Sequence, residues 1–488
     1  MFMKPNRVFC AKVHDAVYAP RPDIALPELP NWAKVTTALL CLRSLFSQAG
    51  LDRTKQDGVD WNPLGDIIHE GEKVVVKPNW VYHHNRSGHG LDCLITHTSV
   101  IEALLHYVVK ARPKSILICD APVQGCNFDA LMASSGVSDM VERFTVNGVK
   151  VQVEDLRLTV RRGEKLSDQG IEDCRPIENY ILYDLGRDSI LEGITSDDPG
   201  FRITMYNPDL LKRTHAHGRH QYLIAREVME ADVMINVPKL KTHKKACITG
   251  ALKNVVGING HKGYLPHHRK GGSLREGDCY RGNSLMKTFI EEALDATNRA
   301  QSTGGRGALA CVVRAGMAVA KLLGEDDNYD GSWYGNDTVW RMTMDLQRLL
   351  HYGSSDGTLS DQVQRKVITL TDAIIAGEGD GPLSPVPTGL GMMTLGINPP
   401  ALEWVHAILM GLDPRGIALT REAFMPHRYP LVDFSPEQIV IKMDGQEVSA
   451  GSLFALHGRK FCLPSGWQTT SEIGDQPISS REESSEPA

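Results

Sequence analysis

Residues 71–155 constrain the fold more than any other part of the chain, because short apolar runs alternate there with segments of helical periodicity. The apolar runs have the length of strands and lie at residues 73–77, 115–119 and 149–153. Two helices are expected between them, at residues 98–111 and 128–144, with Thr98 or Ser99 as the cap of the first. Continuous apolar strands that alternate with helices are typical of a parallel sheet with helices on both faces. The segment therefore predicts an α/β fold built on a mostly parallel sheet.

The remaining residues divide into regions around this unit. Residues 1–70 are expected to add an N-terminal strand and helix. The first α/β lobe is expected to span residues 71–290, with a polar, turn-rich insertion at residues 156–222. A second α/β lobe is expected over residues 291–470. The tail at residues 471–488 is rich in Ser, Glu and Pro and has few apolar residues, so it is predicted to be disordered.

The composition indicates a large globular protein of ordinary character, with 42% apolar and 23% charged residues in a chain of 488. No apolar run reaches the roughly 18–20 residues that a membrane span needs. The first apolar run near the N-terminus is too short and too soon interrupted for a secretory signal. We therefore expect a cytoplasmic protein without a membrane partner.

The ten cysteines are scattered, and no two have the CxxC spacing. This pattern predicts neither a 4Fe–4S cluster nor a zinc ribbon. Cys119, Cys247 and Cys311 lie in apolar runs and are expected to be reduced residues of the core.

A cationic block at residues 233–275 is the strongest functional signal. It contains nine Lys or Arg and four His but no Asp or Glu, whereas the whole chain has a formal net charge of −6. The block follows an apolar, strand-like run at residues 231–237. A positive field at the end of a buried strand favours an anionic ligand, since ligands of open α/β sheets bind at the carboxyl edge.

Two earlier strands are expected to bring polar residues to the same edge. The strand at residues 73–77 ends in Lys77, and Pro78 and Asn79 follow it. Lys77 can bind a phosphate or carboxylate there, or it can be a solvated lysine at a strand end. Asp120 ends the next strand, where it can be a general base, a metal ligand or a cap for the loop that follows.

The block itself supplies further candidates. Lys239, Lys241 and His243 share one side if the segment stays extended, and three cationic groups on one face are stable when an anion lies between them. The two lysines would lower the pKa of His243, so that it could transfer a proton near neutral pH. Lys253 and Asn254 lie in a glycine-containing stretch that could approach the ligand closely.

Two acids in the second lobe complete the candidate site. Glu378 and Asp380 alternate with glycine before Pro382, a pattern that predicts a turn. Such acids could face the cationic block as general acid or base, or they could belong to an ordinary solvated turn. The histidine sets at residues 83–84, 215–220 and 267–268 have no HExxH spacing, and we expect anion binding rather than metal binding from them. No metal site is predicted.

The chain resembles the family known as domain of unknown function 362 (DUF362). The resemblance is carried by motifs that keep their order along the chain, at residues 71–79, 231–243, 249–258, 335–337 and 376–382. Many members carry a ferredoxin-like iron–sulfur segment, but this chain lacks its cysteine spacing, so no cluster is implied. Members also tend to have an Asp in a late helix, where this chain has Glu403 between Leu402 and Trp404.

The layout is also distantly similar to the lactate racemase superfamily. Glu230, Ala231 and Asp232 precede an apolar strand, and His243, Gly250 and Lys253 follow it in the equivalent order. This resemblance would imply an anionic hydroxy acid as substrate, with proton or hydride transfer and a pyridine-type cofactor.

The leading hypothesis is an enzyme that acts on an anionic small molecule, a carboxylate or a phosphate ester, by acid/base or hydride-type chemistry. The cofactor stays unknown, and an oligomer is possible. One alternative is a non-catalytic protein that binds an acidic ligand or partner, and another is a redox protein with a bound cofactor. Nucleic acid is not expected as a partner, because the chain is acidic and the block contains a single aromatic residue, Tyr264.

Overall fold

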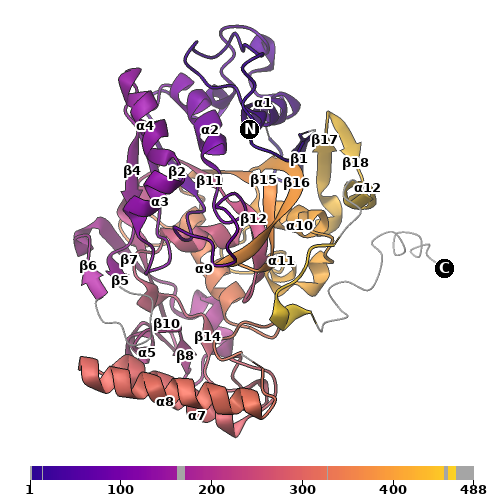
Figure 1. The fold of residues 1–488 in the computed structure, drawn as a ribbon. Coiled ribbons are helices and arrows are strands. Elements are labelled where there is room, and N and C mark those ends of the chain that lie inside the picture. The colour runs from indigo at the N-terminus through magenta and orange to yellow at the C-terminus, as the bar shows by residue number, and fades with distance from the viewer. Residues whose placement is uncertain (1–2, 14, 162–170, 327, 456–459, 469–488) are drawn as a thin grey trace, which may run out of the picture.

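The structure is a computed structural model of the chain (Figure 1). It describes residues 3–13, 15–161, 171–326, 328–455 and 460–468. The tail that was predicted to be disordered, residues 471–488, lies outside the described residues.

A large sheet of eleven strands forms the centre of the molecule. Its strands are β1 Arg7–Lys12, β2 Lys73–Pro78, β3 Ser115–Asp120, β4 Gln152–Asp155, β11 Val233–Val237, β12 Lys239–His243, β13 Cys247–Thr249, β15 Lys366–Asp380, β16 Ser384–Gly396, β17 Val440–Met443 and β18 Gln446–Val448. The order along the main path is β18-β17-β1-β16-β15-β11-β2-β3-β4, and β12 pairs with both β13 and β15. The strands from β15 through β11, β2 and β3 to β4 are parallel. The prediction of an α/β fold with a mostly parallel sheet is confirmed.

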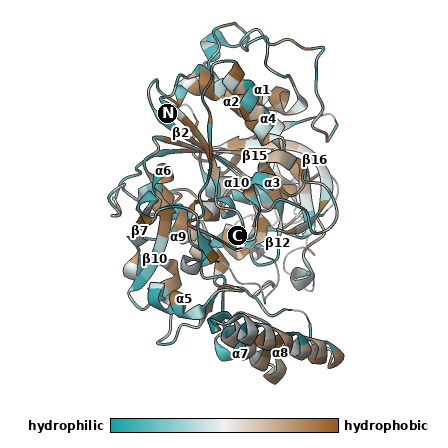
Figure 2. Ribbon diagram, turned by 60° about the vertical axis from the view of Figure 1, so that its left-hand side comes forward, coloured by the Kyte–Doolittle hydropathy of each residue, from teal (hydrophilic) through white to brown (hydrophobic). Residues whose placement is uncertain are grey.

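The sheet separates two hydrophobic cores, because alternate residues of each buried strand face opposite sides. In β2, Val75 belongs to one core, and Val74 and Val76 belong to the other. Four helices cover the Val74 side: α1 Thr37–Gln48, α2 Thr98–Lys110, α3 Phe128–Ser134 and α4 Val137–Val146. The helices that contribute to the Val75 side include α6 Arg226–Met229, α9 Val339–Tyr352, α10 Pro399–Leu409, α11 Ala418–Glu422 and α12 Ala450–Ala455. Figure 2 shows the hydrophobic residues of the central strands between these layers.

Strands from both expected lobes join this one sheet. Residues 71–290 supply β2, β3, β4 and β11–β13, and residues 291–470 supply β15–β18. The boundary at residue 290 therefore does not divide the sheet.

Smaller elements extend the molecule below the sheet as Figure 1 is drawn. They are β5 Thr159–Arg161, β6 Ile171–Asp173, β7 Tyr180–Asp184, β8 Phe201–Arg202, α5 Pro208–Thr214, β9 His215–Ala216, β10 Arg219–Ala225 and β14 His268–Arg269. At the far end, α7 Leu285–Arg299 and α8 Thr303–Leu322 form a helical hairpin. Its inner residues make a small separate core that includes Ile290, Val313 and Tyr329.

Three local predictions were wrong. The helix expected at residues 128–144 is divided into α3 and α4, because Gly136 has a left-handed φ of 75°. The cap of α2 is His97, whose side chain accepts a hydrogen bond from the Ser99 backbone N–H. Cys311 lies exposed on the outer face of α8. Glu378 and Asp380 lie at the end of β15, which pairs with β16 up to Asp380, and the predicted turn follows them at residues 381–383.

Cys119 and Cys247 are buried, as predicted, and all ten cysteines are free thiols. Across the described residues, no helix is both long enough and apolar enough to cross a lipid bilayer.

Candidate functional site

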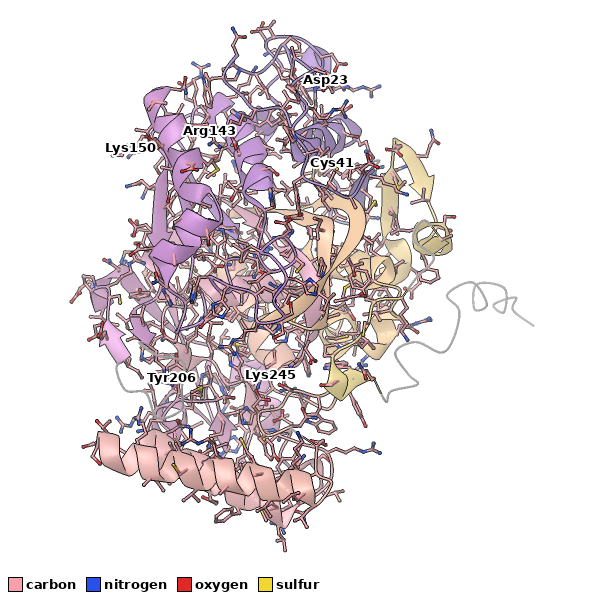
Figure 3. The ribbon with its side chains drawn as sticks, viewed as in Figure 1. Asp23, Cys41, Arg143, Lys150, Tyr206 and Lys245 are labelled. Carbon is pink, nitrogen blue, oxygen red and sulfur yellow. The ribbon has the colours of Figure 1, made fainter. Side chains whose placement is uncertain are left out.

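A cavity of about 850 Å³ lies between the carboxyl edge of the sheet and the α7–α8 hairpin. Six of the ten predicted site residues line it: Asn79, Asp120, His243, Lys253, Asn254 and Asp380. The other four lie outside its lining: Lys77, Lys239, Lys241 and Glu378. In Figure 3, Tyr206 and Lys245, which also line the cavity, lie between the sheet and α8.

Parallel pairing of β2 with β3 brings Lys77 and Asp120 together at the sheet edge. The Lys77 Nζ atom donates a hydrogen bond of 2.7 Å to Asp120 Oδ1, and the side chains are 0% and 4% exposed. The second oxygen, Oδ2, accepts a bond of 2.7 Å from the Trp80 backbone N–H. Lys77 therefore neutralises Asp120 inside the protein instead of facing a ligand.

Asn254 connects two neighbouring strands, β2 and β11, at this edge. It belongs to the 3₁₀-helix η6, Lys253–Ile258. Its Oδ1 atom accepts a hydrogen bond of 3.0 Å from Asn79 Nδ2, and its Nδ2 atom donates one of 2.7 Å to Asn236 Oδ1. Asn79 and Asn254 thus hold the loop after β2 against η6 and β11, and both also line the cavity.

Gly257 in η6 is required by the ion pair beside it. A Cβ atom at this position would lie 1.9 Å from Asp120 Oδ1 and 2.7 Å from Lys77 Nζ. The close approach that the glycine-containing stretch predicted is therefore an approach to protein side chains.

Lys239 and Lys241, both in β12, already have partners within the protein. Lys239 Nζ lies 2.6 Å from Asp372 Oδ2, with both side chains fully buried, and donates a hydrogen bond to the Tyr18 hydroxyl. Lys241 Nζ donates to Asn79 Oδ1 at 2.7 Å and to the Leu94 carbonyl. Burial, together with the charge of Lys239, lowers the pKa of Lys241 to about 7.

Lys253 differs from these lysines because its amine has no partner among the described residues. The residue is 7% exposed, and none of the described side chains or carbonyls forms a hydrogen bond or ion pair with its Nζ atom. Burial, and then the charges of Lys262 and Lys245, lower its pKa to about 7. The Thr249 hydroxyl, which also lines the cavity, is buried and has no hydrogen-bond partner among the described residues.

Two further lysines, Lys262 and Lys245, line this part of the cavity. Lys262 Nζ donates to the Ala121 carbonyl at 3.2 Å, and burial lowers its pKa to about 8. Lys245 Nζ lies 3.2 Å from Asp330 Oδ2, so its charge is balanced. Because only Lys245 of these lysines has a carboxylate partner among the described residues, the net charge of Lys245, Lys253, Lys262 and Asp330 is positive. This charge favours binding of an anion.

His243 can donate a hydrogen bond to a ligand through its Nε2 atom, because its Nδ1 atom is used within the protein. Its Nδ1 atom accepts hydrogen bonds from the backbone N–H groups of Lys245, at 3.0 Å, and Ala246, at 3.3 Å. The neutral ring therefore carries its proton on Nε2. Burial, followed by the charges of Lys253 and His267, lowers the pKa of His243 well below its usual value.

His267 has the opposite tautomer. Its Nδ1 atom lies 2.7 Å from the Leu265 carbonyl oxygen and must donate to it, which leaves a lone pair on Nε2. Burial and the charge of Lys253 lower its pKa well below the usual value, so the ring is neutral at pH 7. His267 lines the cavity and is a proton acceptor that was missed as a catalytic candidate. The sequence feature that could have identified His267 was its position in the cationic block.

The two predicted acids differ in position. Asp380 lines the cavity, where its Oδ1 atom accepts a bond of 3.1 Å from the Ser465 backbone N–H and its Oδ2 atom lies 3.7 Å from Lys244 Nζ. Glu378 accepts a bond of 2.9 Å from the Cys462 backbone N–H. Glu378 therefore anchors the C-terminal segment.

The histidine set at residues 215–220 lies away from the cavity lining. The Nδ1 atoms of His215 and His220 are 3.3 Å apart, and His220 Nε2 lies 3.0 Å from Glu192 Oε2. Within the described ranges, no group of three or more His, Cys, Asp or Glu is arranged to hold a metal ion.

The family model "Domain of unknown function (DUF362)" matches residues 74–174 and 196–407, which is most of the chain and includes nearly all of the cavity-lining residues. The chain belongs to the DUF362 family. No curated protein matches it.

Two solved structures are similar to parts of this DUF362 protein. One is a crystal structure of a protein from Thermotoga maritima, with 12% identity and a TM-score of 0.29, covering 66% of this chain and 50% of that one. The other is the lactate racemase apoprotein from Thermoanaerobacterium thermosaccharolyticum, with 11% identity and a TM-score of 0.24, covering 63% and 44%. The chain thus spans about half the length of the solved structures it matches, and TM-scores this low do not establish a common fold.

Proposed function

We propose that this protein is an enzyme that binds an anionic small molecule, a carboxylate or a phosphate ester, in the 850 Å³ cavity and moves a proton to or from it. Lys253 would bind the anionic group, His243 would donate a hydrogen bond to it, and His267 would accept the proton.

The unpaired amine of Lys253 carries this proposal. A buried cation without a counter-ion is costly, and proteins compensate buried charges by pairing them. Lys253 lacks such a pair among the described residues, although Lys77 and Lys239 nearby both have carboxylate partners. An anionic ligand would supply the missing charge, and Thr249 would supply a hydroxyl donor beside it.

His243 and His267 could act together in acid/base catalysis, because their backbone partners fix opposite tautomers. His243 Nε2–H can stabilise negative charge on the ligand, and His267 Nε2 can take a proton. The low pKa of His267 keeps it unprotonated, and an anion bound beside it would raise that pKa and strengthen it as a base.

Isothermal titration calorimetry with sulfate and with acetate tests the binding step. We expect binding to the wild-type protein, a loss of at least tenfold for Lys253→Met, and a smaller loss for His243→Ala. Equal affinity of the wild type and Lys253→Met would show that the anion site is elsewhere.

Deuterium incorporation from D₂O into a panel of carboxylates and phosphate esters tests the chemical step. Exchange that is lost in His267→Ala, while sulfate binding is retained, would support the enzyme. Anion binding without exchange or turnover of any panel member would instead favour the non-catalytic binding protein.

A further inference from the structure

The cavity is much larger than a carboxylate or phosphate group needs, and its lining has two chemical characters. At the sheet edge Lys253, His243 and His267 line the cavity, and the carboxylate of Asp120 there is paired with Lys77. Farther from the sheet, an apolar wall is formed by Ile203, Met205, Tyr206, Leu294 and Met317, which we call the hairpin wall. Leu294 comes from α7 and Met317 from α8, so the hairpin itself closes this side (Figure 1).

From this arrangement we infer that the ligand is an anion with an extended apolar body, such as a medium-chain or aryl-substituted acid. The inference rests on the proposed function, since the anionic head is the group that Lys253 holds. The body lies along the hairpin wall.

Burial of the wall residues supports an apolar occupant. Met317 and Leu294 are partly buried and pack on the small core of the hairpin, which includes Tyr329. Water in contact with such a wall gains few hydrogen bonds, so an apolar group that displaces it is favoured. The hydroxyl of Tyr206 is buried and has no partner among the described residues, so the wall also offers one polar contact to the ligand body.

The outer face of α8 provides a matched control. Its exposed residues Val312, Val319 and Leu322 are apolar as well, but they point away from the inner face that carries Val313 and the hairpin core. A polar substitution on that outer face changes the hydropathy of the same helix without changing the cavity. Leu322, which is 87% exposed, is the clearest such position.

The test is calorimetric titration with straight-chain carboxylates from acetate to decanoate, each below its micelle concentration. We expect the affinity for the wild type to rise about threefold to fourfold with each added CH₂ until the wall is covered. Lys253→Met should weaken every member of the series by a similar factor. Met317→Gln should flatten the dependence on chain length and leave acetate affinity unchanged, whereas Leu322→Gln should leave both unchanged.

Two results would overturn the inference in different ways. Lys253-dependent binding that does not strengthen with chain length would remove the apolar body but leave the proposed function intact. Binding that strengthens with chain length equally in Lys253→Met and Met317→Gln would show adsorption elsewhere, and the failure of acetate and sulfate to bind at all would remove the proposed function as well.

Discussion

The pair Lys239–Asp372 and the single lysine Lys253 lie near the same edge of the same sheet, but the two regions bury charge differently. In the pair, two opposite charges are buried together, whereas Lys253 is buried without an opposite charge among the described residues. Lys239 and Asp372 are both fully buried and lie 2.6 Å apart, with the Tyr18 hydroxyl bonded to both. Lys253 is nearly as buried but has no partner among the described residues. An ion pair of the first kind fixes the fold, whereas an unpaired charge of the second kind is retained at a cost to stability.

This difference determines which lysines of the cationic block can be assigned to a ligand. Charge and position along the chain do not distinguish Lys239, Lys241 and Lys253, since all three follow the same buried strand. The internal partners of each amine do distinguish them.

Removing the carboxylate of the paired region should have the largest effect. Asp372→Asn leaves the Lys239 ammonium buried without a counter-charge, and we expect a loss of about 3–5 kcal/mol in the free energy of unfolding. Urea denaturation followed by circular dichroism measures it. The matched control is Glu230→Gln, which breaks the half-exposed pair with Lys73 and should cost no more than about 1 kcal/mol. Equal losses would show that burial of the pair is unimportant.

Replacing the unpaired lysine should have the opposite sign. Lys253→Met removes an uncompensated buried charge, and we expect a gain of about 2–4 kcal/mol in the free energy of unfolding at pH 7. The pKa of Lys253 is about 7 in the folded protein and is higher in the unfolded chain, which therefore binds more protons between these values. Wild-type stability should rise with pH in this window, so the advantage of the variant should shrink from pH 7 to pH 10.

Lys114→Met serves as the control for that measurement, because Lys114 is exposed and the change should stay within about 0.5 kcal/mol. A loss of stability in Lys253→Met would mean that the Lys253 amine makes contacts that stabilise the fold. Lys253 would then resemble Lys239 instead of differing from it.

Much of the fold could be predicted because it depends on local patterns. The apolar runs of β2 and β3 identify them as buried parallel strands, and parallel strands end at one edge, so the proximity of Lys77 and Asp120 followed from the sequence. The glycines and Pro382 near Asp380 do mark a turn, at residues 381–383, but pairing with β16 extends β15 through Glu378 and Asp380 up to that turn.

The rest of the site depends on contacts between distant residues. Asp372 contacts Lys239 only because β15 pairs with β12, and no sequence pattern within either strand predicts that pairing. The tautomer of His267 is set by the direction of a single carbonyl, that of Leu265, which composition cannot encode. The sequence therefore indicated which residue types form the cavity but could not tell paired groups from free ones.

Anion binding by the unpaired lysine should depend on pH. Because the pKa of Lys253 is about 7, binding of an anion above pH 7 requires uptake of a proton. We expect the Kd for sulfate, whose charge is constant in this range, to rise about tenfold per pH unit above pH 7 and to level off below it. Before the anion binds, His243 and His267 are neutral over this range, since burial lowers their pKa values well below 6.5. A Kd independent of pH between 6 and 9 would mean that another group binds the anion.

The smallest effect concerns the hydroxyl beside Lys253. Thr249→Val replaces a buried hydroxyl that has no partner among the described residues with a methyl of similar size, so the free energy of unfolding should stay unchanged or rise by up to about 1 kcal/mol. The same variant should weaken sulfate binding about threefold to tenfold, because the ligand loses one donor.

Thr420→Val is the control with the same substitution. The Thr420 hydroxyl is fully buried and donates to the Ile417 carbonyl at 2.8 Å in α11, so its removal should cost about 1 kcal/mol and leave sulfate affinity unchanged. If Thr249→Val instead lost stability and kept its affinity, the Thr249 hydroxyl would belong with the paired groups of the fold. The Lys253 amine would then be the group left to bind the anion at this position, without a hydroxyl donor from Thr249.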